Sequence, residues 1–434
     1  MRTNISKYIH NVALFKEQLL YWSNQFREVA FLESNSESNE NQLYKSYDLI
    51  VAVEAFTSIQ TDSEKAFEDL YQYQSKANDW LFGYLSYDLK NDIEHLKSEN
   101  FDGLHFPDLF FFQPKKIFFL KENTLEIQYL NMCDDEVETD LEEITRSQMS
   151  DVKCQKLPLT IKQRISKENY LQKTQKMLAH IHRGDIYEAN FCMEFFAENA
   201  IIEPLEIYQK LNQISASPFA TYFKKNQHYL LSASPERYLK KEAQKVISQP
   251  IKGTAKRSLD AVIDHQNINE LQNDPKERSE NIMIVDLVRN DLSQTATKGS
   301  VEVEELCKIY SFKQVHQMIS TIVSNVEHTT SPIEILRTTF PMGSMTGAPK
   351  ISAMQIIEEV EETKRGLYSG AVGYFTPTGN FDFNVVIRSI LYNSENQYLS
   401  FSVGSAITSE AIPEKEYEEC LLKANAMFEV LQVK

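Results

Sequence analysis

The chain has 434 residues, of which 42% are hydrophobic and 25% charged, proportions typical of a globular protein. This length is sufficient for one large core or for two domains. The formal net charge of −17 disfavours binding to nucleic acid and to anionic membranes. An anionic substrate would therefore need a local cluster of positive charge or a bound metal ion.

Cysteine use and hydropathy indicate the compartment. No two cysteines form a C-x-x-C pair and their number is odd, which argues against a disulfide framework or a zinc site. The first 22 residues lack the apolar run of a signal peptide, and no segment reaches transmembrane length. We therefore expect a reduced, cytoplasmic protein. The five cysteines are Cys133, Cys154, Cys192, Cys307 and Cys420.

Polar and acidic stretches divide the chain. The segment Ser34–Gln42 is polar and of low complexity, which predicts a surface loop. A second stretch, Asp134–Glu143, is acidic and precedes Leu157-Pro158. We place a boundary near residue 155, between an N-terminal region of residues 1–155 and a catalytic region of residues 156–434.

In the catalytic region, the first elements are a helix and a strand. Apolar residues from Tyr170 to Ile181 recur at helical spacing, and Gly184 is expected to end this helix. The segment Ile186–Phe196 alternates as a strand does, which places Glu188 and Asn190 on one face.

Further along, Gly-Ala-Pro at 347–349 is expected to open an apolar helix, because proline is tolerated in a first turn. The alternation from Phe381 to Ile390 predicts a strand with Arg388 on the same face as Asp382 and Asn384. Long α/β repeats are absent, so an α+β fold with large antiparallel sheets fits better.

Two E-x-x-E pairs are candidates for metal binding. Glu277 and Glu280 begin one expected helix, and Glu416 and Glu419 lie on another. A spacing of three puts each pair on one helical face. Two such faces turned toward each other would supply the oxygen ligands that Mg²⁺ prefers, although solvated helix surface gives the same spacing.

Lysines near these glutamates are a second group of candidates. Lys423 follows Glu419 by four residues, which fits either an exposed ion pair or a cation that holds a substrate carboxylate. Glu236 and Lys252 are spaced as on adjacent strands, and Gly253 would allow close backbone approach to a ligand. The glycine-rich segments 343–350, 367–374 and 403–406 fit structural turns or an anion site at a helix start.

Taken together and in this order, these segments resemble the chorismate-utilising enzymes, a family that includes anthranilate, aminodeoxychorismate, isochorismate and salicylate synthases. The resemblance covers roughly residues 160–430 and is weak before them, where only VAFLESN (29–35) is similar. The motifs that carry it are PIKGT, ENIMIVDLVRNDL, FPMGSMTGAPKISAMQIIEE, GLYSGAVGYF, VVIRS and EYEECLLKA.

The resemblance implies two large antiparallel sheets flanked by helices, with the active site between the sheets. It implies Mg²⁺ bound directly by Glu280 and Glu419, with Glu277 and Glu416 acting through water. It also implies that Glu236 is the general acid at the departing C4 hydroxyl of chorismate. The positions that match substrate-binding residues are Thr254, His316, Ser344, Tyr368, Arg388, Gly404 and Lys423.

Residue 252 separates members of the family. In anthranilate synthases this motif is similar to PIAGT, whereas in aminodeoxychorismate synthases it is PIKGT. This chain resembles the second group, with Lys252 at the middle position. The resemblance therefore implies a lysine amine that attacks C2 of chorismate before ammonia adds at C4. The amine must be neutral, so we expect a neighbouring cation and desolvation to lower its pKa by about three units from near 10.4.

Residue 188 is the second discriminating position. In the family that this chain resembles, isochorismate and salicylate synthases have lysine at this position to activate water. The members that use ammonia generally have glutamine there. Glu188 departs from both patterns. We predict that Glu188 receives or orients ammonium and does not activate water.

The chain has no cysteine in a nucleophile-elbow context with a downstream His-x-Glu. Ammonia should therefore come from a separate glutamine amidotransferase subunit. The alternative functions are the large subunit of anthranilate synthase and a non-enzymatic regulator that binds chorismate or tryptophan.

Overall fold

The structure is a computed structural model that describes residues 1–35, 44–94, 96–147 and 159–431. The loop predicted over Ser34–Gln42 lies mostly outside these residues. Cys154 and the predicted boundary near residue 155 also lie outside them, so the division into two regions stays a prediction.

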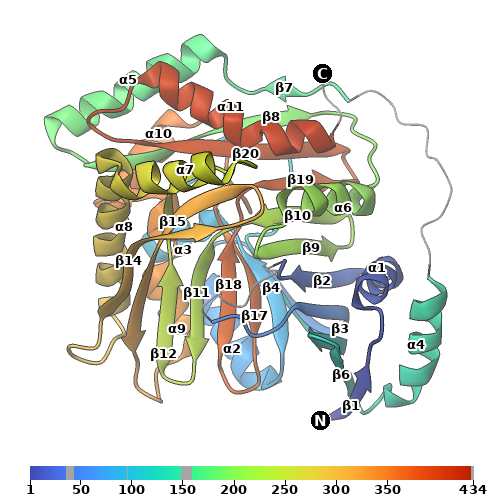
Figure 1. The fold of residues 1–434 in the computed structure, drawn as a ribbon. Coiled ribbons are helices and arrows are strands. Elements are labelled where there is room, and N and C mark those ends of the chain that lie inside the picture. Colours follow the sequence, from blue (N-terminus) through green and yellow to red (C-terminus); the bar gives the residue numbers. More distant parts are fainter. Residues whose placement is uncertain (36–43, 95, 148–158, 432–434) are drawn as a thin grey trace.

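Two antiparallel sheets, here called the first and second wings, make up most of the fold (Figure 1). They meet at one long strand, β5 (Leu109–Lys121). The whole length of β5 pairs with β3. On its other side, residues 109–112 pair with β4 and residues 116–121 pair with β6. The two wings therefore share β5 and diverge on either side of it.

The first wing runs from β8 through β20, β19, β10, β9 and β2 to β3, with β7 and β16 beside β8 and with β6 and β1 beyond β5. Its strands are β1 (Arg2–Tyr8), β2 (Glu28–Glu33), β3 (Leu49–Thr61), β6 (Thr124–Leu130), β7 (Lys162–Gln163), β8 (Glu188–Ala197), β9 (Phe219–Lys225), β10 (His228–Ser234), β16 (Gly347–Ala348), β19 (Ser389–Asn393) and β20 (Tyr398–Ile407).

The second wing runs from β4 through β17, β18, β11 and β12 to β15, which also pairs with β13 and β14. Every ladder between the described strands is antiparallel. The strands of this wing are β4 (Leu81–Leu85), β11 (Arg237–Glu242), β12 (Lys245–Gln249), β13 (Ile251–Lys256), β14 (Glu302–Ser311), β15 (Val315–Asn325), β17 (Ala371–Phe375) and β18 (Phe381–Val385).

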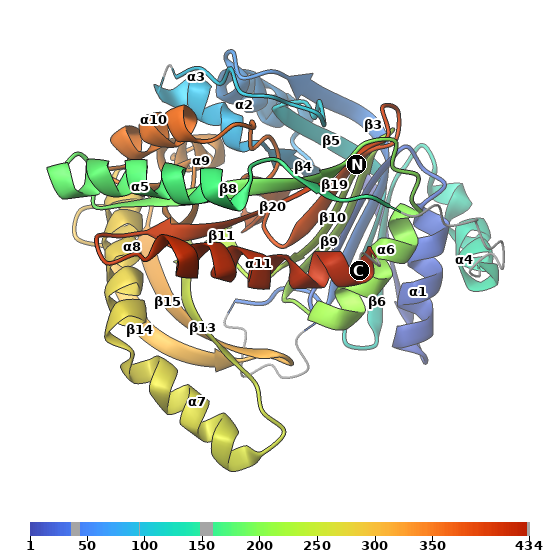
Figure 2. The ribbon, with the colours of Figure 1, turned by 90° about the horizontal axis from the view of Figure 1, so that it is seen from above.

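Helices cover the outer faces of both wings (Figure 2). Helices α5, α6 and α11 lie against the first wing, and α7 and α8 lie against the β13–β15 part of the second. The helices are α1 (Val12–Ser23), α2 (Ala66–Ala77), α3 (Lys90–Glu94), α4 (Val137–Arg146), α5 (Lys167–Arg183), α6 (Pro204–Ser215), α7 (Ala261–Asn273), α8 (Pro275–Ser293), α9 (Pro332–Thr339), α10 (Lys350–Val360) and α11 (Pro413–Val430), with short 3₁₀ turns at Tyr87–Leu89, Asp134–Glu136 and Gly343–Met345.

The sequence predictions of fold class and of most elements are confirmed. The protein is α+β, with two large antiparallel sheets flanked by helices. Helix α5 ends at Gly184, whose φ of +89° is the left-handed conformation that glycine adopts without strain. Strand β8 spans the predicted segment, but both of its faces are buried, because it is covered by helices on one side and by the second wing's residues on the other.

The continuous strand predicted over Phe381–Ile390 is wrong. Strand β18 ends at Val385 and β19 begins at Ser389, and Arg388 between them has a φ of +52°. The chain crosses here from the second wing to the first. Arg388 therefore lies in the crossover and does not share a strand face with Asp382 and Asn384.

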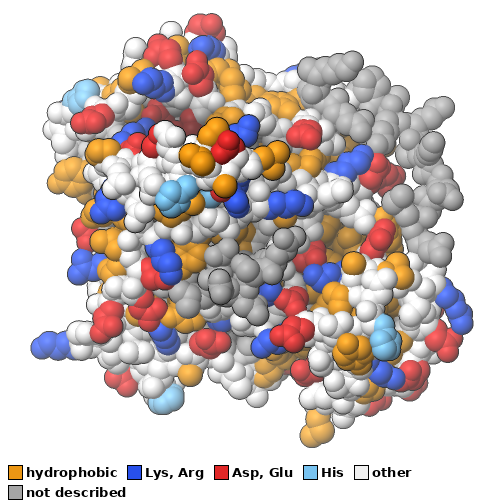
Figure 3. Space-filling model, in the orientation of Figure 1, with side chains coloured by type: hydrophobic (Ala, Val, Ile, Leu, Met, Phe, Trp, Pro, Cys, Tyr) orange, Lys and Arg blue, Asp and Glu red, His pale blue; other side chains and the backbone are white. Residues whose placement is uncertain are grey.

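The described surface carries charges of both signs. In Figure 3, acidic and basic side chains are interspersed over the visible face and do not gather by sign. Among the described residues, no helix is long and apolar enough to span a bilayer. Cys133, Cys192, Cys307 and Cys420 are free thiols and are buried.

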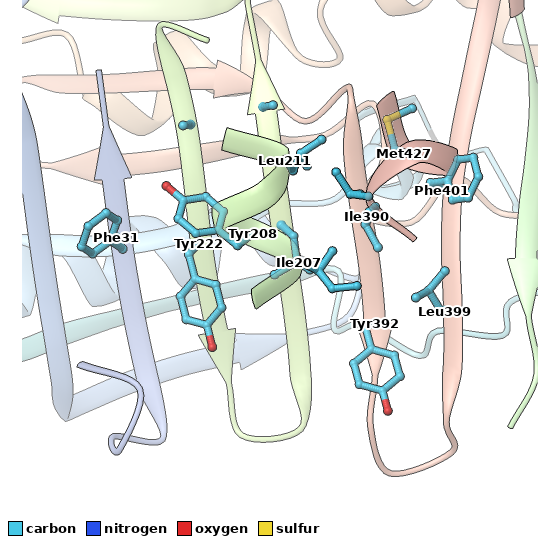
Figure 4. Close-up of a cluster of buried hydrophobic side chains, with 14 of the residues drawn as sticks. Phe31, Ile207, Tyr208, Leu211, Tyr222, Ile390, Tyr392, Leu399, Phe401 and Met427 are labelled. Carbon is cyan, nitrogen blue, oxygen red and sulfur yellow. The ribbon is translucent and has the colours of Figure 1, made fainter. Parts of the chain in front are cut away.

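Two hydrophobic cores hold the layers together. One lies between the first wing and its helices and includes Phe31, Tyr222, Phe401 and Met427 (Figure 4). The other lies between the two wings and is rich in phenylalanine. Because burying a large apolar side chain is worth about 1.5–3 kcal/mol, the first core holds the helices on the first wing and the second holds the two wings together.

Replacing Met427 tests the first core. Met427 on α11 is 0% exposed, so Met427→Ala should lower the free energy of unfolding by about 2–5 kcal/mol through loss of packing. Leu422→Ala on the same helix is the control, because Leu422 is 70% exposed and should change stability by less than about 0.5 kcal/mol. Urea unfolding followed by circular dichroism measures both, and equal losses would contradict the packing described here.

Candidate active site

The structure gathers most of the predicted site residues between β8, β13, α8 and α11. Glu188 begins β8, Lys252 and Thr254 lie on β13, and Glu236 lies just before β11. The two E-x-x-E pairs lie on α8 and α11, as the sequence predicted. The two wings therefore contribute different members of the site.

A buried ion pair joins the wings at this point. The Nζ of Lys252 donates a hydrogen bond of 2.9 Å to Oε1 of Glu188. The two side chains are 11% and 2% exposed. Gly253 has a φ of +91°, and a Cβ there would lie 3.2 Å from Oε2 of Glu277, so β13 passes very close to α8. The sequence predicted close backbone approach to a ligand at Gly253, and that stays a prediction.

The surroundings of Lys252 keep it charged. Burial alone would lower the pKa of this lysine, but the carboxylates of Glu188 and Glu280 outweigh burial and raise the pKa above its ordinary value. The expectation that a neighbouring cation lowers this pKa is therefore wrong for the free site. The reason is that acidic residues from β8 and α8 surround the amine.

Glu236 is the opposite case, an acid that is kept partly protonated. It is 5% exposed, and this burial raises the pKa of its carboxyl to about 7, against smaller lowering effects of Ser344, Lys252 and the N–H of Ile251. The Ser344 hydroxyl is buried without a hydrogen-bond partner of normal geometry. A carboxyl group whose pKa lies near 7 is well suited to donate a proton at neutral pH.

The E-x-x-E faces of α8 and α11 are turned toward each other. Lys276 lies between them, with its Nζ 3.8 Å from Oε1 of Glu280 and 3.4 Å from Oε1 of Glu416. Burial raises the pKa of Glu280 to about 7, and burial together with Glu419 raises the pKa of Glu277. This closeness of like charges is typical of a site that binds a cation.

These residues fit Mg²⁺ by the chemistry of their donors. Oε1 of Glu280 is buried and accepts no hydrogen bond. In the part of the chain that the structure describes, no three acidic, histidine or cysteine side chains converge closely enough to hold a metal ion unaided. Magnesium commonly takes only one or two carboxylates and completes its shell with water and substrate oxygens, so the set is compatible with it.

Cations lie beside the carboxylates. Lys423 pairs with Glu419 and also donates a 2.8 Å hydrogen bond to the carbonyl of Gly404. This pair holds the pKa of Glu419 below its ordinary value, although burial alone would raise it. A Cβ at residue 404 would lie 2.6 Å from Oδ1 of Asn190, so this position has no space for a side chain.

Arg388 and Tyr368 lie deeper. Burial lowers the pKa of the Arg388 guanidinium, while Tyr368 and Glu419 act against that effect. The Tyr368 hydroxyl is buried and lies 3.8 Å from Sγ of Cys192. No carboxylate of the described residues lies within ion-pairing distance of Arg388, which leaves its charge available to a substrate anion.

Thr254 and His316 lie at the other end of β13. Thr254 is exposed and pairs with Gln317 across the ladder between β13 and β15. His316 is fully buried, and its ring nitrogens contact Ser311 at 2.8 Å and Asp264 at 3.0 Å. His316 is therefore held by protein groups, and its predicted contact with substrate stays a prediction.

Sequence reasoning missed two functional groups. The first is Lys276, which precedes Glu277 and stands four residues before Glu280, a helical spacing that could have indicated it. The second is the buried Glu361–Arg365 ion pair. Arg365 also donates hydrogen bonds to the carbonyls of Met345, at 2.6 Å, and Asn190, at 2.8 Å. This pair fixes the turn that carries Ser344 against β8.

Comparisons with known proteins agree with this fold. The profile of the chorismate binding enzyme family matches residues 20–429. The chain belongs to this family.

Among curated relatives, aminodeoxychorismate synthase component 1 of Bacillus subtilis is 30% identical over 406 residues, 91% of this chain and 84% of the relative. Anthranilate synthase component 1 of Thermus thermophilus is 31% identical over 360 residues, 81% of this chain and 77% of the relative. Because the chain is about equally identical to both relatives, these values do not show whether it forms aminodeoxychorismate or anthranilate.

Solved structures show the same fold. Anthranilate synthase component I from Streptococcus pneumoniae superposes with a TM-score of 0.77 at 23% identity, over 90% of this chain and 95% of that one. The menaquinone-specific isochorismate synthase from Escherichia coli also gives a TM-score of 0.77, at 16% identity, over 99% of this chain and 94% of that one.

Breaking the Glu361–Arg365 pair should destabilise the protein. Arg365→Met leaves the buried Glu361 carboxylate without its cation and with only the N–H of Cys192 as a hydrogen-bond donor, which should lower the free energy of unfolding by about 3–5 kcal/mol. The control is Arg146→Met, because Arg146 forms an exposed pair with Glu142 at the same helical spacing and should contribute less than about 1 kcal/mol. Chemical denaturation measures both losses, and losses of equal size would contradict this role of Arg365.

Proposed function

We propose that the protein aminates chorismate at C4 to give 4-amino-4-deoxychorismate, with Lys252 as a covalent nucleophile. The observation that carries the proposal is the position of Lys252, buried between the wings and close enough to Glu236 for each to shift the pKa of the other. An amine and a partly protonated carboxyl are the two groups that a displacement of hydroxide requires.

In the proposed reaction, the neutral amine of Lys252 attacks C2 of the ring. The ring double bond shifts, and the C4 hydroxyl leaves as water with a proton from Glu236. Ammonia then adds at C4, the double bond returns, and the bond between C2 and the lysine nitrogen breaks. Lys252 leaves as a neutral amine, and the new ammonium group at C4 returns a proton to Glu236.

Substrate recognition depends on local positive charge. Arg388 and Lys423 would hold the two carboxylates of chorismate, the first by a bidentate contact and the second as a point charge. Glu280 and Glu419 would bind Mg²⁺ directly, with Glu277 and Glu416 acting through water. The ion would supply positive charge for a substrate carboxylate inside an acidic protein.

Ammonia would come from a partner. The curated relatives that aminate chorismate are named as component 1, which supports a second, glutamine amidotransferase subunit. We propose that this chain uses ammonium salts alone and uses glutamine only with that subunit. Formation of anthranilate is the alternative function, since the Thermus relative carries that name.

The product and the Lys252 variant test the proposal. With chorismate, Mg²⁺ and ammonium, the wild type should form 4-amino-4-deoxychorismate, detected as 4-aminobenzoate after addition of a lyase. Chorismate without ammonia should leave an adduct that peptide mapping by mass spectrometry places on Lys252. Lys252→Ala should lose the adduct and reduce C4 amination by 10²-fold or more, on the order of a lost catalytic group.

Two further variants serve as controls. Lys252→Arg should not restore activity, because a guanidinium stays charged and cannot act as the nucleophile. Lys256→Ala removes an exposed lysine from the same strand and should leave turnover unchanged. Anthranilate as the main wild-type product would show that the alternative function is correct.

The metal prediction concerns α8 and α11. Glu280→Gln or Glu419→Gln should raise the Mg²⁺ concentration needed for half-maximal turnover by roughly 10- to 100-fold or abolish activity. Glu277→Gln should have a smaller effect because its contact is through water. Glu418→Gln on the exposed side of α11 is the control and should match the wild type. Undiminished turnover in excess EDTA would disprove the metal requirement.

A further inference from the structure

The contact between Glu188 and Lys252 has features beyond those of a structural ion pair. Oε1 of Glu188 accepts the hydrogen bond from Lys252, while Oε2 is buried and has no hydrogen-bond partner. A buried carboxylate oxygen without a partner is costly and is retained in few positions unless it has a use. The backbone around Glu188 is fixed, because β16 pairs with β8 at this residue.

Glu188 is the nearest proton acceptor for Lys252. Among the described carboxylates, it alone lies within ion-pairing distance of the amine. Glu236 and Glu280 act on the charge of Lys252 from farther away. Glu277 on α8 and Glu419 on α11 are affected by Lys252 in turn, so acidic groups from β8, α8 and α11 face it.

This arrangement creates a difficulty for catalysis. An ammonium group has no lone pair and cannot attack carbon, yet the surrounding carboxylates favour the ammonium form of Lys252. Loss of the proton to bulk water would have to overcome that field. Transfer along the existing 2.9 Å hydrogen bond would not separate charge, because it turns an ion pair into two neutral groups.

We propose that Glu188 is a further catalytic residue, which takes the proton from Lys252 before the attack and returns it when the amine leaves. The inference rests on the proposed function. The ammonium group of Lys252 gives its proton to the carboxylate of Glu188, which leaves an amine and a carboxylic acid. The bond between the lysine nitrogen and C2 then forms. When that bond breaks after ammonia has added, Lys252 is again a neutral amine, and the Glu188 carboxyl group returns its proton.

The proposal gives a specific pH dependence. If the proton moves within the pair, the fraction of reactive amine does not change with pH while the pair keeps its single shared proton. If Glu188 cannot accept a proton, the amine must lose it to solvent. Its reactive fraction then rises about tenfold per pH unit below the pKa of the lysine. The slope of rate against pH therefore separates the two routes.

The test follows adduct formation on Lys252 by intact-protein mass after rapid mixing with chorismate and Mg²⁺, without ammonia. Because Glu236 donates its proton in the same step, the wild-type rate should fall only above the Glu236 pKa of about 7, and each variant is compared with the wild type at the same pH. Glu188→Gln keeps the size and the hydrogen bond but cannot take a proton. Its rate relative to the wild type should rise with pH and, near pH 6, be on the order of 10²-fold below it.

Glu194→Gln is the matched control. Glu194 lies six residues along β8, is also buried, and pairs with Arg164 away from Lys252. Its variant should keep the wild-type pH profile. Glu188→Asp retains a carboxylate with shorter reach and should keep the wild-type pH profile at a lower rate, which tests the proposal even if the glutamine variant folds poorly.

The outcomes are distinct. The same pH dependence in the wild type and in Glu188→Gln would overturn the role of Glu188 while leaving Lys252 as the nucleophile. A rate of Glu188→Asp that rises with pH relative to the wild type, or a faster reaction of Glu188→Gln at every pH, would also overturn it. Absence of any Lys252 adduct in the wild type would instead disprove the proposed function itself.

Discussion

The site is dominated by an excess of carboxylates held in a partly closed space. Six glutamates are gathered there, and among the described residues four cationic side chains accompany them: Lys252, Lys276, Lys423 and Arg388. Burial raises the cost of each negative charge, which is why the pKa values of Glu236 and Glu280 both rise to about 7. The balance of charge is incomplete in the protein alone, and a divalent cation would complete it.

The same excess explains why each of the three lysines contacts a particular acid. Lys276 lies between the two E-x-x-E faces, where repulsion would otherwise be greatest. Lys423 neutralises Glu419, and Lys252 neutralises Glu188. Arg388 alone of the four has no such carboxylate partner among the described residues, and it lies where the chain crosses between the wings. The crossover thus places a free guanidinium deep in an acidic environment.

The spacing of residues along the sequence predicted those parts of the site that lie within one helix or one strand. The E-x-x-E pairs, the helix ended by Gly184 and the strand of Glu188 all follow from periodicities within about 20 residues. The ordered motifs then predicted the α+β fold. Sequence reasoning did not predict the partner of Lys252, because Glu188 is 64 residues away and belongs to the other wing. It therefore gave the wrong direction for the pKa of that lysine.

The strand β5 shared by the wings limits how the chain could be divided into separate polypeptides. Strands β2 and β4 from the first 147 residues pair with β9 and β17 from the rest of the chain. A catalytic fragment expressed without its N-terminal portion would expose two long unpaired edges, which promote aggregation. Expressing the two fragments together would allow these edges to pair, so that any recovered fold would arise by fragment complementation.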